Sequence, residues 1–191
     1  MTWRLLFSAP MARAFVEGRK GVTRRFDRRL LKAKSGDLLL GKETWRTTEG
    51  LNNLSPAAIA EKCVDAGYHK PWAPIEYVAD GDRRDWLDGF EGQGEPKPGK
   101  LRVSIHMPDW ACRIRARIVS VREEHLQDIT EEDARAEGVV LLTGERTVVE
   151  MAKGYRRLFQ RLWDSIHTGP GQRWDDNPTV VRVEFAPEAR S

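Results

Sequence analysis

The chain has 191 residues, of which 40% are hydrophobic and 32% are charged, and its formal net charge is +3. This composition is too apolar for a disordered chain and too polar for an integral membrane protein. It predicts a single folded, soluble domain spanning residues 1–191, because a chain of this length can bury most of its surface in one core. The sequence shows neither a secretion signal nor a run of transmembrane length, so we expect a cytoplasmic protein with no membrane partner.

The charges are distributed unevenly along the chain. Residues 1–34 carry a net charge of +8, whereas residues 121–150 carry −6. If the basic part gathers on one face, it attracts phosphate groups; the alternative is a solvated surface that the acidic stretch balances. The two cysteines, Cys63 and Cys112, are too far apart and too few to predict a disulfide framework or a cysteine zinc site.

The first half of the chain predicts short elements separated by turns. A strand at residues 3–7 is followed by a short helix that Ser8 caps and that stops at Gly18. The polar segment 19–29 reads as a loop or irregular strand, and a strand follows at residues 38–45. Residues 46–100 are rich in turn residues around one helix at 56–66, which we interpret as an insertion that covers the sheet.

The second half predicts more regular elements. Residues 111–121 alternate between apolar and basic side chains with period two, which is typical of a strand with one buried face. Thr130 caps a short helix that closes at Gly138. Apolar residues at helical spacing predict a core-packing helix over 148–166, and residues 179–185 predict a closing strand. The pattern favours an α+β fold built on a small closed or nearly closed sheet.

The segment from Gly18 to Arg25 is the first candidate for chemistry. Its glycines let the backbone approach a ligand closely. Lys20 can activate a neighbouring hydroxyl if burial or nearby cations lower the lysine pKa, and such cations are present at Arg19, Arg24 and Arg25. The alternative is an ordinary solvated basic loop.

Glu137 is the second candidate, because it is a carboxylate in the last turn of its helix, where the macrodipole disfavours negative charge. Residues that break a local rule are often functional, and this position suits an acid or a base. The alternative is an exposed glutamate, which tolerates the position at a cost of about 0.5 kcal/mol.

The sequence contains no motif for metal binding, phosphate-loop nucleotide binding or serine hydrolysis. The histidines lack the spacing of metal ligands, and the sequence has neither a Walker loop, nor a GxGxxG motif after a strand, nor a GxSxG motif. We therefore expect no metal and no cofactor.

Four motifs in this order resemble the ASCH domain: SAPMARAFVEGRKGVTRR at 8–25, SGDLLLGKETW at 35–45, VREEHLQDITEEDARAEGV at 121–139 and NPTVVRVEF at 177–185. The resemblance covers roughly residues 4–45 and 102–185. Segments 77–80 and 104–108 are similar to the longer branch of the family that phages often encode. The resemblance implies a PUA-like (ASCH) small β-barrel with flanking helices and, here, a long insertion at about 46–100.

The resemblance also implies a function, because relatives of this family bind RNA or modified bases. Small bacterial members hydrolyse N4-acetylcytidine with a lysine and a threonine in a GRKxxT segment and a glutamate at the end of a helix. These correspond to Lys20, Thr23 and Glu137 here. The chain departs from the pattern at Gly21, where the family commonly has another threonine, and in its long insertion.

We therefore expect an amidohydrolase for N4-acylated cytosine in a nucleoside, RNA or DNA, with RNA ahead of DNA. Thr23 is the expected nucleophile, Lys20 its base and Glu137 the proton shuttle. The residues expected to hold a phosphate or a base are Arg19, Arg24, Arg25 and Arg113, with Trp45 either stacking on the base or packing in the core. The alternatives are a non-catalytic reader of RNA or a modified base and an ASCH-type ribonuclease. The sequence leaves the oligomeric state open.

Overall fold

The computed structural model describes residues 1–67, 71, 73–81, 97–139 and 154–188. The chain divides into two compact units. The first unit comprises residues 1–3, 14–39 and 115–191, and the second comprises residues 4–13 and 40–114. The expected insertion at 46–100 falls inside the second unit, and the single-domain organisation stays a prediction.

The fold is mixed α+β, with a five-stranded sheet in the order β1-β3-β6-β7-β2. Its strands are β1 (Thr2–Leu6), β2 (Val22–Arg25), β3 (Leu38–Lys42), β6 (Ile114–His125) and β7 (Thr179–Pro187). As far as the described residues go, the sheet is open, with β1 and β2 at its edges. The closed barrel that the resemblance implies is therefore not formed by these strands, because no pairing joins β1 to β2.

The predicted period-two strand is confirmed as β6. Its residues from Ile114 to Ile118 alternate between buried and exposed, as the apolar and basic side chains require. The strand begins three residues later than predicted, because residues 109–111 form a short 3₁₀ turn. It pairs antiparallel with β7 from Ala116 to His125, with a register shift between Ile118 and Ser120.

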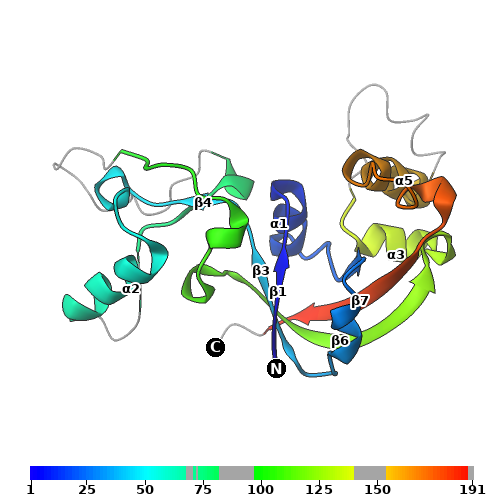
Figure 1. Ribbon diagram of the computed structural model, residues 1–191, viewed down its shortest axis with the longest axis horizontal. Helices are drawn as coiled ribbons and strands as arrows, with labels where there is room; N and C mark the ends of the chain where they lie inside the picture. The colour runs from blue at the N-terminus through cyan, green and yellow to red at the C-terminus, as the bar shows by residue number, and fades with distance from the viewer. Residues whose placement is uncertain (68–70, 72, 82–96, 140–153, 189–191) are drawn as a thin grey trace. The chain divides into compact units, whose positions relative to one another are not determined.

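Helices α3 and α5 pack against each other beside β6 and β7 in the first unit (Figure 1). Helix α3 (Glu131–Ala136) starts as predicted, because the Thr130 side chain accepts a hydrogen bond from the Asp133 backbone at 3.1 Å. Helix α5 (Gly154–Ile166) confirms the predicted helix over its described part, while residues 148–153 lie outside the described residues. Its aromatic stripe packs in the core, where Phe159 and Trp163 are each 4% exposed.

The remaining elements are short. Helix α1 covers Ala9–Val16. In the second unit, α2 (Pro56–Asp65) confirms the helix predicted at 56–66 and is capped by Ser55, while β4 (Trp45–Arg46) pairs antiparallel with β5 (Glu76–Tyr77). The 3₁₀ helices are Arg28–Lys32, Glu49–Leu51, Val78–Asp80, Ser104–His106, Asp109–Ala111, Leu126–Asp128 and Trp174–Asp176. Within the described ranges, every helix is too short or too polar to cross a membrane.

Candidate functional site

Lys20 and Glu137, which are 117 residues apart, meet in the interior of the first unit. The two residues form an isolated β-bridge, and both are buried, with 3% and 4% of their surface exposed. The Lys20 Nζ donates to Glu137 Oε2 at 2.9 Å and to the carbonyl oxygens of Glu137 and Val22 at 2.8 Å each. The structure therefore brings together two of the three residues expected to be catalytic.

Two glycines allow this approach. Gly18 ends α1 with a φ of +73°, after which the Lys20 backbone N–H donates to the Ala14 carbonyl at 3.1 Å. Gly138 follows Glu137 with a φ of +86°, and a Cβ atom there would lie only 2.6 Å from the Ala14 Cβ. Any other residue at position 138 would combine a left-handed backbone with a clash. Glycine is therefore required where the end of α3 approaches α1.

Burial lowers the pKa of the Lys20 amine below its ordinary value of 10.5, because the charged form loses its hydration. The Glu137 carboxylate acts in the opposite direction, through its charge and its hydrogen bond, and Arg25 and Arg24 add to the lowering. Burial is the larger effect. A lysine in this position gives up its proton more readily than an exposed one, as a base requires.

Thr23 lies in β2, 3% exposed, in register with Val183 of β7. The Lys20 amine binds the carbonyl oxygen of the peptide that joins Val22 to Thr23, so it lies beside the Thr23 backbone. Strand alternation places the Thr23 side chain on the opposite face of β2 from Arg24. Among the described residues, no hydrogen bond joins the Thr23 hydroxyl to Lys20. The structure thus places the Thr23 backbone next to the amine of the pair.

Arg24 is fully enclosed, with 0% of its side chain exposed, and three carboxylates bind it. It contacts Glu137 Oε1 at 3.1 Å, Glu124 Oε1 at 2.7 Å and Asp133 Oδ2 at 2.7 Å. A phosphate could reach it only by displacing these partners. Arg24 therefore holds Glu137 in place rather than offering a free cation, which differs from the expected role in substrate binding.

Sequence reasoning missed the residues around Arg24. Arg182 of β7 lies directly opposite Arg24 in the sheet, a repulsive arrangement unless an anion lies between them. Asp133 supplies that anion, since it also accepts from Arg182 at 2.9 Å. The sequence signals this network only through the acidic residues of α3. The pairing of Arg24 with Arg182, which requires an anion such as Asp133, is visible only in the structure.

Arg19 and Arg25 lie on either side of these residues in the chain. The Arg19 guanidinium donates to Glu17 and to the Gly138 carbonyl at 3.0 Å. Burial lowers the pKa of Arg25, and the charge of Glu137 opposes this effect. Both arginines belong to the first unit. Neither the hydrogen bonds of Arg19 nor the charge effects at Arg25 identify a ligand.

Trp45 and Arg113 belong to the second unit. Trp45 is fully buried and packs edge-on against Trp110, with ring centroids 6.4 Å apart. Arg113 donates to Glu43 and Asp80 and lies 3.9 Å above the Tyr77 ring. The burial of the Trp45 ring favours core packing, one of the two roles that the sequence left open for this residue, and the Arg113 guanidinium is bound by two carboxylates.

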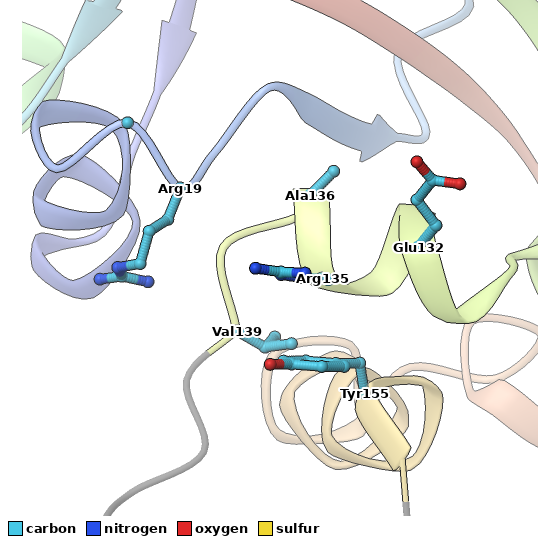
Figure 2. Close-up of a pocket in the computed structure, with 7 residues that line it drawn as sticks. Arg19, Glu132, Arg135, Ala136, Val139 and Tyr155 are labelled. Atoms are coloured by element: carbon cyan, nitrogen blue, oxygen red, sulfur yellow. The ribbon is translucent and has the colours of Figure 1, made fainter.

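The first unit also contains a pocket of about 500 Å³ that sequence reasoning did not find (Figure 2). Arg135 and Tyr155 contribute its exposed cation and its aromatic ring. The residues lining it are Gly18, Arg19, Glu132, Arg135, Ala136, Val139 and Tyr155. None of the three expected catalytic residues lines the pocket, although Arg19 precedes Lys20 and Ala136 precedes Glu137.

In the part of the chain that the structure describes, no group of three or more histidine, cysteine, aspartate and glutamate side chains is placed to hold a metal ion.

Comparisons with known proteins give matches among solved structures alone. No family model matches the sequence, and no curated protein does. An ASCH domain from Lactobacillus crispatus JV V101 is 11% identical, with a TM-score of 0.35 over 97% of this chain and 79% of that one. The hypothetical protein PH0355 is 12% identical, with a TM-score of 0.38 over 98% of this chain and 100% of that one. At these TM-scores the likeness supports no statement about the site. The solved structures similar to this chain thus include a member of the family that its sequence motifs resemble.

Proposed function

We propose that the first unit is a hydrolase that removes the acyl group from N4-acylated cytosine, in a nucleoside or in RNA. The observation that carries the proposal is the buried pair of Lys20 and Glu137, in which an amine with a lowered pKa lies 2.9 Å from a carboxylate. Such a pair can accept a proton and pass it on. The substrate class comes from the resemblance of the segment 18–23 and of Glu137 to the ASCH hydrolases.

In the proposed reaction, the Thr23 hydroxyl oxygen attacks the acyl carbon while neutral Lys20 takes the hydroxyl proton. Glu137 passes that proton to the exocyclic nitrogen as its bond to the acyl carbon breaks, and cytosine leaves with a free amino group. Water then hydrolyses the acyl-threonine ester, which releases the carboxylic acid and restores the hydroxyl. Each assisted proton transfer contributes about 10²- to 10⁴-fold to the rate.

Access to Thr23 is part of the proposal. The Lys20 amine lies 2.8 Å from the carbonyl oxygen of the Val22–Thr23 peptide, and the reaction requires a shift in β2 that brings the Thr23 hydroxyl to this amine. Such a shift is feasible because β2 is an edge strand with a partner on one side only.

The proposal is tested by incubating the purified protein with N4-acetylcytidine and with short RNAs and following the products by mass. We expect acetate and cytidine from the unaltered protein, and a loss of at least about 10²-fold in Lys20→Ala, Thr23→Ala and Glu137→Gln. Circular dichroism checks that each variant is folded. Full activity in all three folded variants would show that these residues are not the site.

A second function, a non-catalytic reader of RNA or of a modified base, is favoured by one observation. The three hydrogen-bonding positions of the Lys20 ammonium are matched by three acceptors, as in a structural ion pair. A reader gives no turnover, and its binding weakens steeply with salt. Shortened RNA in the same assay would instead identify a ribonuclease.

A further inference from the structure

We infer that the pocket beside the Lys20–Glu137 pair binds the phosphate group of a nucleotide, with Arg135 as its principal cation. The inference deepens the proposed function, on which it rests for the reaction but not for the binding. It predicts that the protein prefers a phosphorylated nucleoside or an RNA chain over a free nucleoside.

Among the described residues, Arg135 differs from Arg19, Arg24 and Arg182 in forming no ion pair with a carboxylate. Arg24 and Arg182 are held by Asp133, and Arg19 is held by Glu17. Arg135 is exposed on α3, and within the described residues its guanidinium forms no ion pair. A guanidinium with all its donors available, placed in a concave site, suits a phosphate group, because its planar fork matches two phosphate oxygens.

Besides Arg135, the pocket offers a second positive charge, from Arg19, and an aromatic ring, from Tyr155. Figure 2 shows Arg135 and the Tyr155 hydroxyl directed toward the side on which Arg19 lies, with the Tyr155 ring below Arg135 in this view. The ring is half-buried and is fixed at the start of α5, where Glu131 Oε2 accepts from the Tyr155 backbone N–H at 2.6 Å. An aromatic ring so fixed can stack on a base, and Arg19 adds a second positive charge.

Size and polarity also fit this ligand class. A volume of about 500 Å³ lies within the usual range of small-molecule sites. Glu132 is the one carboxylate among the lining residues, and Figure 2 shows it on the side of α3 away from Arg19. It can accept hydrogen bonds from sugar hydroxyls or an exocyclic amine, while the phosphate lies toward the arginines.

The pocket adjoins the proposed catalytic pair through the backbone. Arg19 is the residue before Lys20, and Ala136 is the residue before Glu137. The Gly21 N–H donates to the Ala136 carbonyl at 2.9 Å, which joins the two chain segments. A phosphate held on Arg135 would therefore fix one part of a substrate close to the segments that carry the pair.

The experiment is isothermal titration of the full chain with cytidine 5′-monophosphate and with cytidine. We expect the monophosphate to bind at least about tenfold more tightly, and Arg135→Gln to remove about tenfold of that affinity while leaving cytidine binding unchanged. Arg135→Lys, which keeps the charge without the fork, should lose less. The matched control is Arg157→Gln, an exposed arginine of α5 that does not line this pocket, and it should bind as the unaltered protein does.

The dinucleotide CpC, which has only an internal phosphodiester, is titrated in parallel. Affinity for cytidine 5′-monophosphate or for CpC that depends on Arg135 supports the inference. The ligand that shows this dependence identifies whether the pocket binds a terminal or an internal phosphate. Three results would overturn the inference. The first is equal affinity for the monophosphate, CpC and cytidine, and the second is no binding of the phosphorylated ligands. The third is an equal loss of affinity in Arg135→Gln and Arg157→Gln. Turnover of N4-acetylcytidine is measured on the same samples: Arg135-dependent binding without turnover overturns the hydrolase alone, whereas turnover without phosphate preference overturns the pocket alone.

Discussion

Each of the two units buries a glutamate against a cation, but the cations differ. In the first unit Glu137, 4% exposed, lies against Lys20; in the second unit Glu43, 1% exposed, lies against Arg113. The Lys20 pKa is lowered, because burial outweighs the attraction of Glu137. Burial also acts to lower the Arg113 pKa, but its hydrogen bonds to Asp80 and Glu43 and the charges of these carboxylates outweigh burial and leave that pKa raised.

This difference separates a pair that can exchange a proton from one that can only hold a structure together. A guanidinium stays charged at any pH at which the protein is folded, so the Arg113 cluster cannot act as a base. A buried lysine with a lowered pKa can. Burial of an ion pair alone is therefore no sign of catalysis, whereas the type of cation is informative.

The largest expected effect comes from exchanging the cation type. Lys20→Arg keeps the charge beside Glu137 but removes proton exchange, so turnover of N4-acetylcytidine should fall by about 10²-fold or more. Lys20→Gln, which is smaller and neutral, should show the same loss if the bulk of arginine prevents folding. The reverse exchange, Arg113→Lys, is the control and should leave turnover unchanged. Turnover equal to that of the unaltered protein in folded Lys20→Arg would remove Lys20 from the reaction.

The second effect is on stability and concerns Arg113. Arg113→Ala leaves Glu43 and Asp80 without their cation, and we expect a loss of about 3 kcal/mol in the free energy of unfolding, because an uncompensated buried charge is costly. Urea denaturation measures this loss. Arg115→Ala, which breaks an exposed pair with Glu188, should cost less than about 1 kcal/mol. Equal losses in the two variants would contradict the structural role of the Arg113 cluster.

A smaller effect is expected at Trp45. Trp45→Phe leaves a partly filled core, which should lower the free energy of unfolding by about 1 to 2 kcal/mol. Because the ring is fully buried, the affinity for nucleotides should not change. Thermal unfolding and titration with cytidine 5′-monophosphate measure the two quantities. Weaker nucleotide binding at unchanged stability would restore the stacking role.

The smallest effect is a pair of opposite pH dependences of the free energy of unfolding, each at most about 1.4 kcal/mol per pH unit. Between the lowered pKa of folded Lys20 and 10.5, the unfolded chain binds the extra proton, so stability rises with pH. Burial raises the pKa of Glu43 above 4.5, so its contribution is complete below 4.5 and is lost as pH rises through the folded pKa. Urea denaturation at a series of pH values measures the free energy of unfolding. Lys20→Gln should flatten its dependence on pH below 10.5, and Glu43→Gln should flatten its dependence on pH above 4.5. An unchanged slope in either variant would contradict the corresponding pKa shift.

Local signals predicted much of the fold. The cap at Thr130 and the left-handed Gly138 located α3, and strict alternation located β6. Strand β2 was only partly predicted, because two of its four residues are basic and the strand depends on pairing with β7. Sheet closure also depends on long-range pairing, which local pattern does not encode.

The candidate site was predicted in part for a similar reason. Lys20 and Glu137 were linked by resemblance, and their contact is found. The partners of Arg24 follow from strand register and from the placement of α3, so a basic sequence segment could not reveal that this arginine is enclosed. Trp45 shows the same limit, since neither its neighbours nor its type distinguishes a stacking ring from a core ring.

In the proposed reaction, the Lys20–Glu137 pair activates Thr23. The most direct test is peptide mass mapping after brief incubation with N4-acetylcytidine and rapid acid quench, in the unaltered protein and in Glu137→Gln, where the reaction should slow. We predict one added acetyl group on the peptide that contains Thr23, absent in Thr23→Ala and in Lys20→Arg. Turnover with no acetylated Thr23 in any sample, or with the acetyl group on another residue, would contradict the claim.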